Sequence, residues 1–298
     1  MYGFRIEKSI EKRLRMNNDT KLRISKVKQT TGNVLKYAVV IFCCTLALYP
    51  FLWVIISSFK DNQEIYMNSI GLPKVWRVDN YLRVFRSPSL LIGYRNSIVI
   101  TFSVMAITLL IGSMAAYVIS RKLKGSLMAT YFTMGIMIPM TSILIPSFLL
   151  LTRLHLVGTM FGIIIAYAAS QLSITIFILV GFMKGISKEL EEAAIIDGCS
   201  NTRTFFSIIF PLSKPGIATA MTLVFLYCWN DYLYALIIGG SGNLRTLIVA
   251  ITYFKTEFKT EYGPICAGLI FSIVPITIAY GLLQEQVIKG LAEGAIKA

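Results

Sequence analysis

The sequence predicts an all-α integral membrane protein with six membrane-spanning helices. Of its 298 residues, 55% are hydrophobic and only 15% are charged, a more apolar composition than a soluble chain of this length normally has. A bilayer core about 30 Å thick requires roughly 20 apolar residues of helix, because the backbone polar groups must be satisfied inside the segment. Six segments meet this requirement: Tyr37 to Ser58, Asn96 to Ser120, Leu127 to Thr152, Met160 to Met183, Gly216 to Gly239 and Tyr262 to Gln284.

The basic residues predict how these spans are oriented. Residues 1–36 form an arm with ten Lys and Arg against three acids, and positive charge beside a span is held on the cytoplasmic side. We therefore expect a cytoplasmic N-terminal arm, a membrane domain over residues 37–289 and a cytoplasmic tail over 290–298. The loop 184–215 then also faces the cytoplasm. Within the arm, Ile6 to Leu22 is amphipathic enough to contact lipid or a partner.

Several classes of function are disfavoured by the composition. The net charge of +14 is explained by topology and anionic lipid headgroups, so we expect no nucleic-acid partner. The chain contains no Gly-Lys dipeptide and hence no P-loop, which predicts that it does not hydrolyse ATP. One histidine, His155, and five cysteines without a CxxC pair predict no metal site, no catalytic site and no cofactor on this chain.

An acidic segment within the loop 184–215 stands out in this basic protein. Four of the fifteen carboxylates fall within nine residues, at Glu189, Glu191, Glu192 and Asp197. We expect a helix that begins at Lys188, is capped by Ser187, and ends at Gly198. Leu190, Ala193 and Ala194 share one face of this helix, and a second short helix follows from Asn201 to Ile209, closed by Pro211 and Pro215. The segment is either a docking surface for a partner or an ordinary loop helix on the membrane surface.

Polar residues inside the spans mark a candidate solute pathway. Asp231 is the one acid within a predicted span, and such residues usually face the protein interior or a water-filled cavity. On a continuous helix it shares a face with Tyr227, Asn230 and Tyr234, an aromatic and amide stripe that suits a sugar. A weaker patch of the same kind lies in the fourth span at Tyr167, Ser170, Gln171 and Ser173. Interfacial aromatic residues or contacts between helices are the alternative explanation.

Prolines predict where the spans bend. Pro139 and Pro146 lie in the third span and Pro275 in the sixth, although proline is common in membrane helices. A gradient-driven secondary transporter or channel is a rival class, but the spans show no internal repeat and no array of acids for proton coupling.

The motif Glu192-Ala193-Ala194, followed by Gly198, Ile209 and Pro211, resembles the EAA loop of ATP-binding-cassette importer permeases. Flanking motifs resemble the carbohydrate branch, in particular the second permease of maltose and multiple-sugar systems. Ser187 departs from this pattern, since relatives usually place a proline there. The flanking motifs include Tyr49-Pro50-Phe51-Leu52-Trp53, Trp229-Asn230-Asp231 and Gly290-Leu291-Ala292-Glu293-Gly294-Ala295.

This resemblance implies the type I importer permease fold in a bacterial cell membrane and a non-catalytic role in an assembly. The implied partners are a homologous second permease, two cytoplasmic ATPase subunits that bind ATP and Mg, and an extracytoplasmic sugar-binding protein. The solute is a sugar or oligosaccharide, with glycerol-3-phosphate or a polyol as the alternative. The residues implied in ATPase coupling are Glu191, Glu192, Ala193, Ala194, Asp197, Gly198 and Pro211, with Gly290, Gly294 and Ala295 as a second coupler at the C-terminus.

Overall fold

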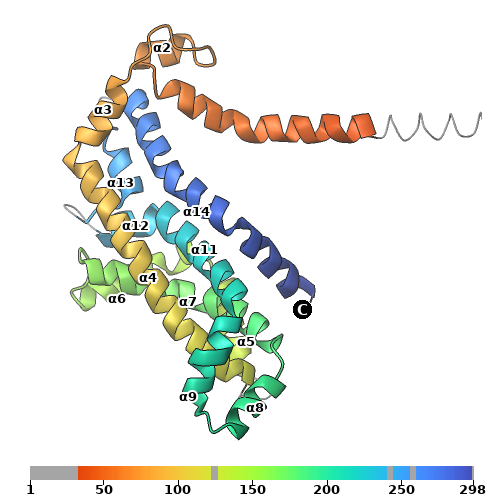
Figure 1. Ribbon diagram of the computed structural model, residues 1–298. Coiled ribbons are helices and arrows are strands. Elements are labelled where there is room, and N and C mark those ends of the chain that lie inside the picture. The colour runs from red at the N-terminus through yellow and green to blue at the C-terminus, as the bar shows by residue number, and fades with distance from the viewer. Residues whose placement is uncertain (1–32, 122–126, 240–243, 256–259, 297–298) are drawn as a thin grey trace, which may run out of the picture. The chain divides into compact units, whose positions relative to one another are not determined.

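The computed structural model describes residues 33–121, 127–239, 244–255 and 260–296, without the side chains of 283 and 285–296. The predicted basic arm therefore lies almost wholly outside the described residues. Every named element in the described part is a helix, and one isolated bridge joins Lys255 to Thr260 (Figure 1). The chain divides after Ile56 into two compact units, which are described separately.

Four helices are long and apolar enough to cross a membrane. The number rises to six if each of two bent helix pairs counts as one span, namely Leu127–Met137 with Met140–Arg153 and Asn201–Leu212 with Lys214–Asn230. The described part of the first unit is residues 33–56, which belong to the helix Asn33–Ser57. In the second unit the long helices are α4 (Pro88–Arg121), α7 (Met160–Lys184) and α14 (Tyr262–Ile296). The predicted all-helical membrane class is confirmed.

The third predicted span is a bent pair. Helix α5 covers Leu127–Met137 and α6 covers Met140–Arg153, and their axes meet at 97°. Pro139 lies at the break in extended conformation, with ψ 130°, and its ring nitrogen has no proton to continue the helical hydrogen bonds. The bend predicted at this proline is confirmed, whereas Pro146 lies inside α6.

The fifth predicted span, Gly216 to Gly239, was wrong as a continuous helix. Helix α11 (Lys214–Asn230) ends before Asp231, and α12 (Leu233–Gly239) begins two residues later. Asp231 adopts an extended conformation with ψ 133°, and its carboxylate accepts a hydrogen bond from the backbone of Ala235 at 3.0 Å. A carboxylate in this position caps the following helix, so the aspartate starts α12 instead of continuing α11.

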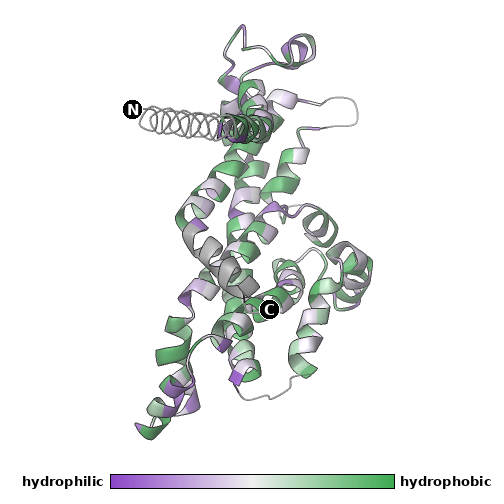
Figure 2. Ribbon diagram, turned by 90° about the vertical axis from the view of Figure 1, so that its right-hand side faces the viewer, coloured by the Kyte–Doolittle hydropathy of each residue, from purple (hydrophilic) through white to green (hydrophobic). Residues whose placement is uncertain are grey.

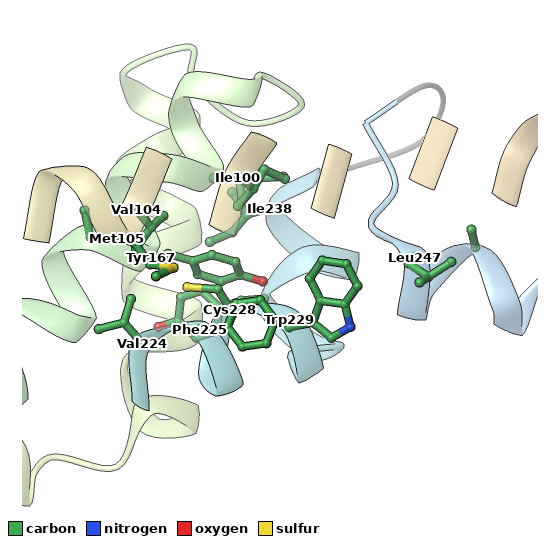
Figure 3. Packing of buried hydrophobic residues seen from close by; sticks show 14 of the residues in the cluster. Ile100, Val104, Met105, Tyr167, Val224, Phe225, Cys228, Trp229, Ile238 and Leu247 are labelled. Atoms are coloured by element: carbon green, nitrogen blue, oxygen red, sulfur yellow. The ribbon is translucent and has the colours of Figure 1, made fainter. Parts of the chain in front are cut away.

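The core of the second unit forms where α4 packs against α7, α11 and α13 (Leu247–Thr252). Side chains from α4, α7, α11 and α12 converge there around the fully buried Tyr167 (Figure 3). The glycine Gly112 on α4 allows a close approach, since a Cβ atom there would lie 2.8 Å from the Cγ2 of Thr175 on α7. Small residues at such crossings let the backbones of membrane helices come near one another.

The two ends of the second unit are built differently. At one end lie the short helices α2 (Asn62–Met67) and α3 (Asp79–Arg86). The ammonium group of the buried Lys60 donates to two backbone carbonyls just after α2, and the amide of Asn80 on α3 donates to the backbone carbonyl of Lys60 at 2.9 Å. At the other end lie α8 (Glu189–Ile196) and α9 (Asn201–Thr204) (Figure 1). Hydrophilic residues gather toward both ends, and hydrophobic residues dominate the helices between them (Figure 2).

Candidate functional site

The acidic helix predicted in the loop is present as α8, and its C-terminal end follows the predicted chemistry. The predicted cap was wrong, because α8 begins at Glu189 and its N-cap position is Lys188, which makes no side-chain cap hydrogen bond. Ser187 lies one position earlier, where its hydroxyl accepts a hydrogen bond from the N–H of Glu189 at 3.2 Å. At the end, Gly198 has a φ of +81°, and the N–H of Cys199 reaches the carbonyl of Ala194 at 2.9 Å. This is the Schellman arrangement, in which a left-handed glycine satisfies the last carbonyls of a helix.

The two faces of α8 have different surroundings. Glu191 and Ala194 are buried against the rest of the chain, whereas Glu192, Ala193 and Asp197 are exposed. The face predicted from Leu190, Ala193 and Ala194 is therefore divided, because Ala194 points inward. The exposed side presents two carboxylates around a small alanine, which lets another surface approach closely.

Glu191 does not lie on the exposed side, because it forms an ion pair inside the protein. Its Oε1 atom lies 3.0 Å from the Nε of Arg121, the last residue of α4, and the side chains are only 10% and 3% exposed. Arg121 also donates from Nη2 to the backbone carbonyl of Ile186 at 2.8 Å. The arginine thus holds both α8 and the turn that precedes it.

The second limb of the loop is also helical but irregular. After α9, residues Phe205–Ile209 form a π-helical turn, η1, and Phe210–Leu212 form the short helix α10, in which Pro211 lies near the start. The ring of Phe205 packs on the ring of Tyr117 of α4 with centroids 5.2 Å apart. The helix predicted from Asn201 to Ile209 is present, but the predicted closure by the two prolines was wrong. The helical path continues through Pro211 to Leu212 before it bends by 75° into α11, and Pro215 lies inside α11, because proline is tolerated in the first turn of a helix.

The break at Asp231 is a polar centre within the core. The hydroxyl of Tyr167 donates to Asp231 Oδ2 at 2.6 Å, and the same oxygen accepts from the backbone of Ala235. The hydroxyl of Tyr234 donates to the backbone carbonyl of Met140 at 3.2 Å, directly after the break between α5 and α6. Hydrogen bonds from tyrosines therefore support both helix breaks.

The pathway residues predicted on one helical face are separated by this break. Asn230 is exposed at the end of α11, and its amide donates to the backbone carbonyl of Leu226 at 2.8 Å. Tyr227 is partly buried, with its ring centroid 5.9 Å from that of Tyr167. Gln171 is buried on α7, so among these residues Asn230 is the one with an exposed side chain.

Sequence reasoning missed one residue of the loop site. The sequence alone assigned Arg121 no role at this site, although it pairs with Glu191, 70 positions later in the chain. No local pattern shows such a pairing, because it depends on how α4 and α8 pack. The C-terminal Gly290, Gly294 and Ala295 lie in α14, in the stretch for which only the backbone is described.

Comparison with known proteins identifies the family. The family model described as "Binding-protein-dependent transport system inner membrane component" matches residues 108–291, more than half of the chain. The chain belongs to this family. It is 33% identical over 252 residues to the probable ABC transporter permease YurM of Bacillus subtilis, covering 84% of this chain and 83% of that protein.

Other members of the family are similar over most of their length. The permease AmyC of Thermoanaerobacterium thermosulfurigenes, named for starch degradation products, is 32% identical. The matched region covers 89% of this chain and 98% of AmyC. The trehalose/maltose permease MalG of Thermococcus litoralis is also 32% identical, over 86% and 94% of the two chains. Membership confirms the predicted class of ABC importer permease over a gradient-driven carrier.

A solved structure supports the fold. A chain of a bacterial ABC transporter that imports the acidic polysaccharide alginate superposes with a TM-score of 0.75, covering 85% of this chain and 95% of that chain at 21% identity. The likeness extends to almost the whole of that chain, so the two chains share an overall fold.

Proposed function

We propose that this permease forms half of a sugar pathway and that the exposed side of α8 docks on a cytoplasmic ATPase. The observation that carries the proposal is the division of α8 into a buried side, with Glu191 and Ala194, and an exposed side, with Glu192, Ala193 and Asp197. A helix anchored on one side and acidic on the other suits a groove lined by Arg or Lys.

The roles of the loop residues follow from this division. Glu192 pairs with a basic group of the ATPase, and Ala193 permits close contact. Glu191 and Ala194 hold the helix from behind, while Gly198 makes the turn that ends it. Pro211 begins α10 and directs the chain toward α11.

Replacing Gly198 with valine is the test of docking. Valine at a φ of +81° is strained by about 1–2 kcal/mol, so the end of α8 unwinds and the acidic side loses its shape. We expect the Gly198→Val importer to lose most of its co-purifying ATPase and its solute uptake. Gly198→Asn, which tolerates the left-handed conformation, should keep both.

Gly158 provides a matched control, because it also has a positive φ, +74°, and at both glycines nothing lies within 4 Å of an added Cβ atom. It lies in the loop between α6 and α7, and Gly158→Val should leave the ATPase bound. Unchanged uptake and unchanged ATPase binding in Gly198→Val would contradict the docking role.

The proposed solute is a neutral sugar or oligosaccharide. The relatives carry names for starch degradation products, for trehalose and maltose and for diacetylchitobiose, all of them carbohydrates. Glycerol-3-phosphate or a polyol remains the alternative within the same class. Hydroxyl-rich solutes need amide and hydroxyl groups as hydrogen-bond partners. The exposed amide of Asn230 is next in the chain to Asp231, whose carboxylate accepts a hydrogen bond from the hydroxyl of Tyr167.

Asn230→Ala tests the pathway. The amide is exposed, so its loss should raise the solute concentration for half-maximal uptake by roughly fivefold, through the loss of about one hydrogen bond, and should leave the ATPase bound. Transport by the variant is measured in proteoliposomes with the binding protein present. Loss of the ATPase at unchanged solute affinity would indicate a structural role instead.

The remaining parts of the assembly complete the proposal. The loop 184–215 and both termini face the cytoplasm, a second homologous permease completes the pathway, and an extracytoplasmic binding protein delivers the sugar. ATP and Mg bind to the two partner ATPase subunits. The C-terminal end of α14, with Gly290, Gly294 and Ala295, contributes a second contact to the ATPase.

A further inference from the structure

We propose that Arg121 is a positioning residue that transmits the movement of α8 directly to the membrane helix α4. In the chain, α8 is joined covalently to α7 through a short turn and to α11 through α9 and α10. Helix α4 ends about 70 residues earlier, yet its last residue forms the buried ion pair with Glu191. The inference rests on the proposed docking of α8 and adds a route into the membrane domain.

The ion pair is a strong constraint because both partners are buried. The side chains of Arg121 and Glu191 are 3% and 10% exposed, and their atoms Nε and Oε1 have no hydrogen-bond partner among the described residues. Each of these charged atoms is thus compensated by the other across 3.0 Å. Separating them would leave the carboxylate of Glu191 buried without a counter-charge and Arg121 with only the carbonyl of Ile186, so movement of α8 away from α4 is costly.

Arg121 acts together with neighbouring contacts at the end of α4. Its Nη2 donates to the carbonyl of Ile186, which fixes the turn between α7 and α8. One helical turn earlier, Tyr117 packs on Phe205 of η1, in the second limb of the loop. Two residues of α4 at i and i+4 therefore hold both limbs of the loop from one helix face.

Helix α4 leads from this anchor into the core. It is a single helix of 34 residues, and its residues Ile100 and Val104 belong to the cluster around Tyr167 (Figure 3). Tyr167 in turn holds Asp231 at the break of the fifth span. A rigid helix thus connects the ion pair at the loop with the side chains that surround the polar centre.

The test uses the complete importer, with its ATPase and binding protein, in proteoliposomes. Four variants are compared: Arg121→Ala, Arg121→Lys, Glu191→Gln and the double variant Arg121→Ala with Glu191→Gln. Arg153→Ala is the matched control, since Arg153 also lies in the last turn of its helix but is exposed. The readouts are co-purifying ATPase, maximal uptake, solute concentration for half-maximal uptake, and ATP hydrolysed per solute.

We expect Arg121→Ala to keep the ATPase bound, because the exposed side of α8 remains, and to lower maximal uptake by at least about fivefold at unchanged half-saturation. The number of ATP molecules hydrolysed for each solute molecule transported should rise, because the ATPase still binds but its movement reaches α4 less well. Arg121→Lys keeps the charge without the guanidinium fork and should recover part of the uptake. The double variant should transport no worse than Arg121→Ala, because Glu191→Gln has no ion pair left to break once the guanidinium is gone.

Three results would overturn the proposal: unchanged uptake in Arg121→Ala, additive losses in the double variant, or an uptake loss that only follows loss of bound ATPase. An effect of Arg153→Ala equal to that of Arg121→Ala would overturn it as well. These outcomes are distinct from failure of the docking proposal, which is decided by ATPase binding in the Gly198 variants.

Discussion

The Asp231→Ala importer is expected to be clearly less stable than the wild type and to lose most of its transport. One oxygen of Asp231 accepts the hydroxyl of Tyr167 at 2.6 Å and the backbone of Ala235 at 3.0 Å. Alanine leaves the buried tyrosine hydroxyl without this acceptor and α12 without its cap, which together cost about 2–3 kcal/mol. Thermal unfolding of the purified importer and solute uptake measure the effect.

Two milder variants separate the contributions. Asp231→Asn keeps an oxygen acceptor and should retain more than half of the stability that alanine loses, whereas Tyr167→Phe removes one hydrogen bond and leaves the cap intact. The expected order of unfolding temperatures is therefore wild type, Tyr167→Phe, then Asp231→Ala. An Asp231→Ala importer that unfolds and transports like the wild type would show that neither bond matters.

The sequence predicted the helical membrane class well because long apolar runs have few alternatives in a bilayer. It also predicted the end of α8 at Gly198, since a left-handed glycine acts on the backbone within a few residues of its own position, whereas the helix begins one residue later than predicted. Local chemistry of this kind is visible in sequence. The bend at Pro139 was predictable for the same reason, because proline lacks the backbone donor.

The break at Asp231 was not predicted because it depends on a partner from another helix. Hydropathy favours a continuous span from Gly216 to Gly239, and a single aspartate does not interrupt such a pattern by itself. The carboxylate is stabilised there by Tyr167, 64 residues earlier in the chain. The pairing of Arg121 with Glu191 escaped prediction for the same physical reason, since both partners become visible only after the helices pack.

Gly216→Ala is expected to disturb the loop from its base. Gly216 lies near the start of α11, and a Cβ atom there would be 2.5 Å from Cγ of Phe182 and 2.9 Å from its Cβ, near the end of α7. These atoms lie close to the backbone of Phe182 and cannot swing aside as the end of a long side chain would. The two helices must therefore move apart, at a cost of about 2 kcal/mol.

Because α7 and α11 lead into and out of the loop 184–215, this displacement should also lower ATPase binding. Unfolding temperature and co-purifying ATPase are measured together. Gly181→Ala is the matched control, because nothing lies within 4 Å of a Cβ atom there, and it should change neither quantity. Adding Phe182→Ala to Gly216→Ala removes the ring that causes the clash. The double variant should therefore recover part of the unfolding temperature and part of the co-purifying ATPase. If the double variant is worse than Gly216→Ala alone, close packing at Gly216 is not what holds the base of the loop together.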